Sequence, residues 1–377
     1  EEVLHTSFEY VLKNYYKPFL VAFHAVINFT NVRLRKGTCF EEWGIALESM
    51  SKFSKGIHPG IDYGFDPKEA MQDNYNRSRG WHDKYNDALF AFGKLYYGDN
   101  ITVHFTELEL WTFSRVYEWD SMEVLFGDMT RNFKIPPDYV TLQSNKLYEQ
   151  KNAAKIISKR YKKGEPYTGE LKHIPDGIAE GLRNGTLEPE FFEQWYTSTV
   201  KGMFNGIYGT MAQDIYKPNY KCEGGELLVD EDTITTEENF EEKTPRSTRV
   251  MYTYGMRIVG GSRMHMVIAM ELIYNHFGSR VRILGGDTDS MKMSCDEDVT
   301  DEEIERALEP IAIASTEAIN RCMYRLRNQF PDLASGLGGV GGFEIENAGR
   351  HYKLHYECWN KTRVSFDGEH THITAAG

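Results

Sequence analysis

Gly285-Gly286-Asp287-Thr288-Asp289-Ser290 is the stretch around which the chain is organised. The apolar run 281–284 precedes it, and the alternating run Met291-Lys292-Met293-Ser294 follows it. This pattern predicts a strand, a tight glycine turn and a second strand. Residues two apart on a strand share a face, so Asp287 and Asp289 can direct two carboxylates at one point.

Two carboxylates without a basic neighbour repel each other and favour a cation between them. A purely oxygen donor set suits a hard ion such as Mg²⁺. Gly, Asp and Ser are also ordinary turn formers, and a short motif is weak support for a metal. The stretch alone therefore leaves a metal site and a plain polar hairpin both open.

The composition is that of an ordinary globular protein of 377 residues, which suggests two or three domain-sized units. The net charge of −13 argues against a uniformly basic nucleic-acid coat, but clustered acidic residues leave room for a local basic groove. The five cysteines show no CxxC pairing, so we expect free thiols, a reducing compartment and no zinc site. We expect no membrane span and no signal peptide. Both ends look like the interior of a longer polypeptide, so we expect an excised piece.

The first third of the chain predicts a strand at 24–34, a loop at 54–90 and a short strand at 95–105. Thr106 stands where a helix N-cap is expected, with Glu107 and Glu109 in a first turn that the helix dipole favours. Leu108 and Trp111 open the apolar stripe of that helix.

Residues 141–163 predict a long helix with one apolar side and one basic side. The apolar side carries Leu142, Leu147, Ala153, Ala154, Ile156 and Ile157; the basic side carries Lys146, Lys151, Lys155, Lys159, Arg160, Lys162 and Lys163. A lysine run is often just a solvated helix face. In an acidic protein it also fits a phosphate-rich ligand, because phosphate contacts supply most nucleic-acid affinity.

Residues 188–216 predict a second helical region. Lys201, Asn205 and Tyr208 fall on one face of it, which is either a plain polar surface or a ligand-binding face. The acidic segment 217–248 predicts an exposed loop or hairpin insertion. Helices follow at 249–278 and from Thr300, which forms a capping-box pattern with Glu303. Strands are expected from 343 to 374.

In combination, these motifs resemble the core of B-family DNA polymerases, most closely the protein-primed branch of phages and mobile elements. The third motif of that family, YxDTDS, resembles 285–290, with Gly285 where tyrosine is usual. The second motif, KxxxNSxYG, resembles 201–209, with Gly206 where serine is usual. The lysine-tyrosine element resembles 360–363, with Arg363 where an aromatic residue is common, and 256–263 resembles the apolar helix ending in arginine.

The resemblance implies an α+β fold: a palm with an antiparallel sheet and packed helices, plus helical fingers and insertions. It divides the chain into an N-terminal palm part (1–140), fingers helices (141–216), an acidic insertion (217–248) and a second palm part with the DTD hairpin and the lysine element (249–377). Neither an exonuclease domain nor a thumb is evident in the sequence. A protein of this kind acts in the cytoplasm, here that of the host of a phage or mobile element.

The function implied is DNA-templated nucleotidyl transfer with two Mg²⁺ ions, which Mn²⁺ can replace. Its partners are primer-template DNA, deoxynucleoside triphosphates and a terminal priming protein. Asp287 and Asp289 are the implied catalytic metal ligands. The implied nucleotide-binding residues are Lys201, Asn205, Tyr208, Lys155 and Lys159. The implied DNA-binding residues are Gly209, Arg263, Thr288, Ser290, Lys361 and Arg363.

The first motif of the family, DxxSLYP, has only a divergent counterpart at 3–10, where Val3 stands in the place of a metal-binding aspartate. Glu1 or Glu2 is a weak substitute for that aspartate. Asp120 is a poorer candidate, because its sequence context fits the helix that follows the first motif better than the motif itself. Two other functions therefore stay open. One is an impaired polymerase-like module that binds DNA or a priming protein, and the other is a different two-metal enzyme such as a nuclease. The nuclease would not need the Lys201 helix face.

Overall fold

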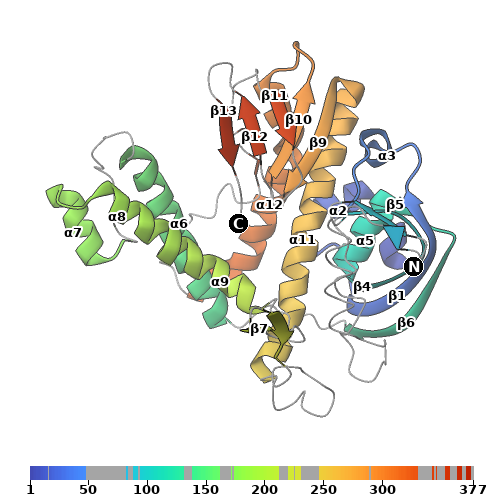
Figure 1. Cartoon of the computed structure of the whole chain (residues 1–377), viewed down its shortest axis with the longest axis horizontal. Coiled ribbons are helices and arrows are strands. Elements are labelled where there is room, and N and C mark those ends of the chain that lie inside the picture. Colours follow the sequence, from blue (N-terminus) through green and yellow to red (C-terminus); the bar gives the residue numbers. More distant parts are fainter. Residues whose placement is uncertain are drawn as a thin grey trace.

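The computed structural model describes residues 1–15, 17–47, 82–83, 88–91, 94–130, 138–161, 171, 174–211, 220–224, 226–230, 246–287, 290–329, 342–343, 345, 353–356, 363–366 and 371–374. This part of the chain is a mixed α+β structure with antiparallel sheets, in agreement with the expected class. Figure 1 shows a body around the longest strands, a helical arm on one side and the long helix α11 between them.

The main sheet is antiparallel, and its central strand is β1, which pairs with β4 on one side and with β5 and β6 on the other. Its strands are β1 (Ala22–Leu34), β2 (His82–Asp83), β3 (Ala88–Ala91), β4 (Lys94–Thr106), β5 (Tyr117–Glu118) and β6 (Ser121–Thr130). Val103 and Phe105 of β4 lie opposite Ile27 and Ala25 of β1, and all four are buried on the face that packs on the helices.

The strand expected at 95–105 is confirmed as β4, which runs one residue further at each end and pairs with β1 from Tyr97 to Thr106. The loop expected at 54–90 was wrong at two places. Residues 82–83 and 88–90, expected in a loop, lie in β2 and β3, which add to the edge of the same sheet. Backbone pairing to an existing edge overrides the turn-forming composition of such segments.

The sheet packs on α5 (Glu107–Val116) and α11 (Arg246–Phe277) to form the main core. Phe29, Phe105 and Phe113 meet there edge to face or tilted, with ring centroids 5.1–5.7 Å apart. The body also holds α1 (Glu2–His5), α2 (Phe8–Lys13), α3 (Cys39–Trp43) and α12 (Asp301–Gln329). The expected N-cap at Thr106 and the expected capping box at Thr300 are both confirmed. The structure adds that Thr106 also forms a capping box, with Glu109.

The arm consists of α6 (Asp138–Tyr161), α7 (Asp176–Asn184), α8 (Pro189–Gln194), the π-helix η2 (Trp195–Val200) and α9 (Lys201–Met211). It has a small core of its own, in which Ala154, Ile157 and Phe192 are fully or almost fully buried. Ile156, expected on the apolar side of α6, is half exposed instead. In the acidic segment, β7 (Tyr220–Glu223) and β8 (Glu226–Val229) form an antiparallel hairpin, which confirms the expected hairpin for those residues.

After α11 and the 3-10 turn η4 (Gly278–Arg280), the chain forms the hairpin of β9 (Val281–Asp287) and β10 (Ser290–Cys295). The strands expected after residue 343 are β11 (Lys353–Tyr356), β12 (Arg363–Phe366) and β13 (Thr371–Thr374), a three-stranded antiparallel sheet. Among the helices of the described ranges, none has the length and apolar content that a membrane crossing needs.

Candidate functional site

The β9–β10 hairpin is confirmed, but its turn follows the glycines instead of containing them. Asp287 pairs with Ser290, and Gly285 and Gly286 lie within β9 opposite Lys292 and Met291. Only Thr288 and Asp289 separate the paired ends, and both lie outside the described residues, as does the side chain of Asp287. Because β9 ends at Asp287, the prediction that Asp287 and Asp289 share one strand was wrong. The convergence of their carboxylates stays a prediction.

A β-bulge decides which register position Asp287 occupies. Lys292 opposes Gly285, and the next residue of β10, Met293, opposes Ile283, so Leu284 has no opposite residue. Ile283 is fully buried in the core. Simple alternation from Ile283 would place position 287 on the core side, whereas the bulge moves it into register with Ser290 and Lys292. The extra residue thus places position 287 in register with Ser290.

The described side chains contain no group of three or more His, Cys, Asp or Glu residues that could hold a metal ion. Asp287 and Asp289 are not among these side chains, because they lie outside the described ones. Their donor chemistry, carboxylate oxygens with neighbouring hydroxyls, is the kind that Mg²⁺ takes. The register places position 287 opposite Ser290, whose hydroxyl would be one such neighbour.

The N-terminal segment offers no third carboxylate at the position expected from the first motif. Val3 lies in α1 with 4% exposure and belongs to the main core. Glu1 and Glu2 are exposed at the start of α1, whose neighbour is α5. Val3 is buried among apolar side chains and has no oxygen in its side chain, so position 3 offers no side-chain ligand for a cation.

Asp120 lies between β5 and β6, and its expected place in a helix was wrong. Its carboxylate accepts hydrogen bonds from Asn31 Nδ2 at 2.6 Å and from Arg33 Nη1 at 3.0 Å. These two donors hold the pKa of Asp120 below its ordinary value, with the Asn31 bond the larger cause. The structure thus shows Asp120 fastening the end of β1 to the β5–β6 turn.

Helix α9 presents Lys201, Asn205 and Gly209 as exposed residues, as expected for a polar face. The side chain of Tyr208 lies outside the described ones. Directly before α9, the Lys201 N–H donates to the Tyr196 carbonyl, five residues back, at the end of the π-helix. Such π turns are rare and are frequent at functional sites. Lys201 is therefore the first residue after a local change of helical pitch.

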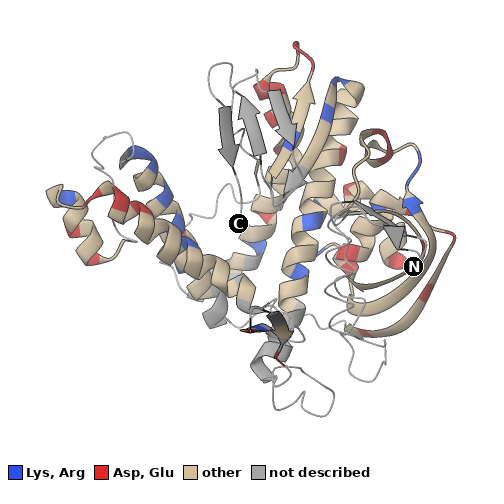
Figure 2. Cartoon of the chain, viewed as in Figure 1, with Lys and Arg blue, Asp and Glu red and all other residues tan. Residues whose placement is uncertain are grey.

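Helix α6 runs antiparallel to the α8–α9 segment. Ser158 donates a hydrogen bond to Glu193, while Lys151 Nζ lies 4.6 Å from the ring centroid of Phe204. Lys155 is exposed one turn beyond Lys151 on the same side of α6. Lys159 is exposed one further turn away. The described basic residues of α6 thus run along the α8–α9 segment (Figure 2), with Lys155 nearer to Lys201 than Lys159 is along this register.

Buried charges join α5 to the middle of α11. Arg257 donates to Glu107 Oε1, and Arg263 Nη1 donates to Glu109 Oε1 at 2.9 Å. Both glutamates are almost fully buried, and the arginine side chains are 13% and 18% exposed. Burial raises the pKa of the Glu109 carboxyl, and the Arg263 guanidinium opposes this rise. Arg263, expected to contact DNA, thus has a carboxylate partner inside the protein.

The remaining expected DNA-binding positions are only partly described. Ser290 is half-buried at the first position of β10, and Arg363 opens β12 with its side chain outside the described ones. Thr288 and Lys361 lie outside the described residues. A common DNA-binding surface for these positions stays a prediction.

The roles of Glu107, Glu109 and Arg257 were not predicted from the sequence. The two glutamates were assigned only to the helix dipole, because their partners lie 150 and 154 residues further along the chain. One local signal was present: Gly260 stands between two arginines in an otherwise apolar helix, which indicates a close helix approach flanked by charge. A Cβ at Gly260 would lie 2.8 Å from Glu109 Cγ.

Comparisons with protein-family models, with curated proteins and with solved structures give no match for this chain.

Proposed function

We propose that the chain is the core of a DNA-templated DNA polymerase, which transfers a nucleotidyl group to the 3′ hydroxyl of a primer. One observation carries this proposal beyond the motifs. Helix α11 packs against α9, which holds Lys201, and continues through η4 into β9, which holds Asp287. A single helix therefore connects the two segments that would supply the nucleotide side and the metal side of one site (Figure 1).

Lys201 is the proposed contact for the triphosphate of the incoming nucleotide. Its ammonium group is exposed at the first turn of α9, and a compact point charge suits a phosphate group. Asn205, one turn further along, would face the nascent base pair together with Tyr208, which would also pack on the sugar. Lys155 and Lys159 would add positive charge beside the triphosphate or the template backbone.

Asp287 and Asp289 would hold the two Mg²⁺ ions. When bound, these ions activate the primer oxygen and neutralise the leaving pyrophosphate. Gly209, Thr288, Ser290, Lys361 and Arg363 are the proposed contacts for DNA, whereas Arg263, which was also expected there, is paired with Glu109 inside the protein. Base pairing would select the nucleotide, so contacts from the protein would go mainly to phosphate and sugar and would weaken with salt. Primer-template DNA, deoxynucleoside triphosphates and a terminal priming protein are the partners that this function implies.

A second candidate is a polymerase-like module that binds DNA or a priming protein without catalysis. The burial of Val3 in the core favours it, because the first-motif position then contributes no carboxylate. The two candidates share the Lys201 face and differ only in whether the hairpin carries out nucleotidyl transfer.

Primer extension by the purified 377-residue chain separates the two. A labelled primer-template is incubated with deoxynucleoside triphosphates and either Mg²⁺, Mn²⁺ or a chelator, and binding of the same DNA is measured by fluorescence anisotropy. Extension with either metal and none with the chelator supports the polymerase. Binding without extension in both metals supports the non-catalytic module, and a chain that neither binds nor extends contradicts both.

A further inference from the structure

The middle of α11 is held to the body by two buried ion pairs and one close helix approach. We name the set Glu107, Glu109, Arg257, Gly260 and Arg263 the α5–α11 clamp. We propose that Arg257 and Arg263 are positioning residues, which fix the rotation and the level of α11 and thereby set the nucleotide-binding helix relative to the metal-binding hairpin. This inference rests on the proposed function.

Each glutamate of the clamp divides its two oxygens between the body and α11. Glu107 Oε2 accepts the Phe23 N–H at 3.1 Å, while Oε1 accepts from Arg257. Glu109 Oε2 accepts the Thr106 N–H at 3.1 Å, while Oε1 accepts from Arg263 at 2.9 Å. Both carboxylates are thus anchored in the sheet and in the first turn of α5 before they meet α11. A shift of α11 would leave them charged, buried and short of a partner.

Gly260 fixes the distance between the two helices. A Cβ there would lie 2.8 Å from Glu109 Cγ and 3.1 Å from Thr106 Oγ1, and Thr106 is completely buried. At about 100° per residue, Arg257 and Arg263 lie about 60° to either side of Gly260 on α11. Rotation of the helix in either direction would therefore pull one arginine away from its glutamate.

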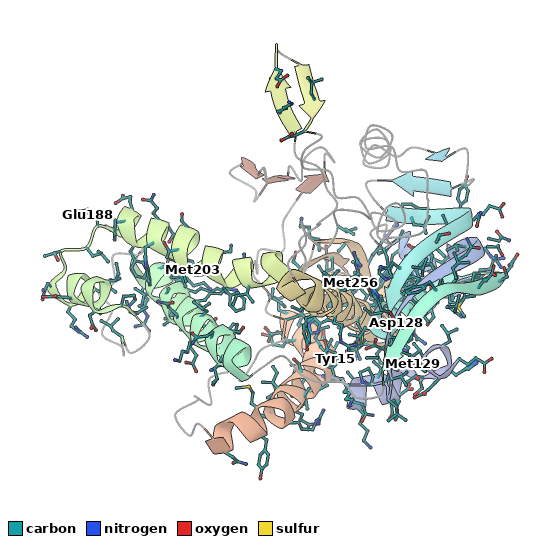
Figure 3. All side chains as sticks on the ribbon, turned by 90° about the horizontal axis from the view of Figure 1, so that it is seen from below. Tyr15, Asp128, Met129, Glu188, Met203 and Met256 are labelled. Atoms are coloured by element: carbon teal, nitrogen blue, oxygen red, sulfur yellow. The ribbon has the colours of Figure 1, made fainter. Side chains whose placement is uncertain are left out.

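The helix held in this way leads to both sides of the proposed site. Figure 3 shows Met256, one residue before the clamp, beside the strands of the body near Asp128, while Met203 on α9 lies further out toward the arm. His24 Nε2 lies 3.1 Å from Met256 Sδ, which adds a contact with β1 at the same level. Past the clamp, α11 continues into the core and then into β9. Small errors of placement are costly, because a shift of about 1 Å at a distant residue can lower a rate about 100-fold.

Two variants separate positioning from stability. Arg263→Met leaves Glu109 charged and buried, so it should destabilise the protein and slow incorporation. Arg263→Met combined with Glu109→Gln removes both charges, and glutamine still accepts the Thr106 N–H in a capping box. Stability should then return toward wild type. If the clamp positions α11, the maximal rate of single-nucleotide incorporation stays about 100-fold low in the double variant, while the Kd for primer-template changes less than about threefold, and Arg263→Lys recovers part of the rate.

A rate that recovers together with stability in the double variant would overturn the inference, since the pair would then only hold the fold. Arg321→Met is the matched control, because Arg321 pairs with Glu317 at 3.6 Å on the surface of α12, and it should change neither quantity.

A distance measurement tests the clamp even if the wild-type chain shows no incorporation, which would contradict the proposed function alone. Spin labels are attached through bio-orthogonal side chains at the exposed residues Met203 of α9 and Ser294 of β10, with the native cysteines left in place. The wild-type and Arg321→Met proteins should give one narrow distance distribution. The double variant should give a shifted or broadened one, and an unchanged distribution would overturn the inference.

Discussion

Arg263 of α11 and Lys201 of α9 carry the same charge on two helices that pack together, yet their surroundings are opposite. Arg263 donates to a buried carboxylate, and its side chain is 18% exposed. Lys201 is exposed at the start of its helix. The comparison shows why counting basic residues does not locate an anion site. A cation that the fold already neutralises holds the structure together, whereas an exposed cation can meet a phosphate.

The largest expected effect concerns the metal side of the site. Asp289→Asn should lower nucleotide incorporation by roughly 1,000-fold, equal to about 4 kcal/mol, because the amide is a poor ligand for Mg²⁺. The DNA affinity, measured by anisotropy, should stay nearly unchanged. Asp296→Asn, an exposed aspartate just after β10, is the control and should leave the rate unchanged. Extension by Asp289→Asn at the wild-type rate would remove Asp289 from the metal site.

The next effect contrasts the two cations directly. Arg263→Met should lower the free energy of unfolding by about 3–5 kcal/mol, because Glu109 stays buried without its partner. Lys201→Met should change it by less than about 0.5 kcal/mol, as is usual at an exposed position. Urea unfolding followed by circular dichroism measures both. Equal losses would show that the two charges have equivalent surroundings after all.

Arg263→Met should also change how stability depends on pH. The folded pKa of Glu109 is raised by burial, so the stability linked to this group is greatest below its ordinary pKa and is lost as pH rises through the folded value. Removal of Arg263 takes away the main opposing effect and raises the folded pKa further. The stability gap between the variant and wild type should therefore widen from pH 5 to pH 8 in urea unfolding. A gap that is constant over this range would contradict the assigned surroundings of Glu109.

Lys201→Ala should raise the nucleotide concentration that gives half-maximal incorporation about tenfold, the loss of one charge-assisted contact. DNA binding should weaken much less. Lys13→Ala, an exposed lysine on α2, is the matched control. Equal losses of nucleotide and DNA affinity would assign Lys201 to the DNA instead of the triphosphate.

The smallest effect compares the two capping boxes. Thr300 caps α12 at an exposed position, so Thr300→Ala should cost about 1 kcal/mol of stability. Thr106 caps α5 beneath α11 and is completely buried, so Thr106→Ala should cost about 2 kcal/mol. The ratio of the two losses measures how far burial by α11 strengthens the same local motif. A larger loss at Thr300 would contradict the tight packing at Gly260.

The sequence predicted best what depends on neighbouring residues. The N-cap at Thr106, the capping box at Thr300, the long helices and the β9–β10 hairpin follow from residues a few positions apart, and all are found. The bulge at Leu284 was missed, because alternation of side chains cannot reveal one extra residue in a strand. The short strands β2 and β3 were also missed, because a turn-forming composition does not reveal pairing to the edge of a sheet.

Of the candidate site, the sequence predicted the exposed face of α9 and the position of the hairpin, but not the clamp between them. Glu109 and Arg263 are 154 residues apart, and no local pattern links them. The lysines of α6 were predicted to form a basic side of that helix. Only the fold shows that Lys151 contacts the ring of Phe204, whereas Lys155 is exposed. Tertiary contacts were therefore needed to distinguish the basic residues that hold the fold together from those that are exposed to a ligand.

Templated nucleotidyl transfer differs from the other candidate functions in that the template selects the nucleotide. Single-turnover incorporation by the 377-residue chain is measured in Mg²⁺ with a nucleotide complementary to the next template base and with a non-complementary one. We expect metal-dependent addition of the complementary nucleotide and far slower addition of the other. Failure to add the complementary nucleotide, or addition of both at the same rate, would contradict it.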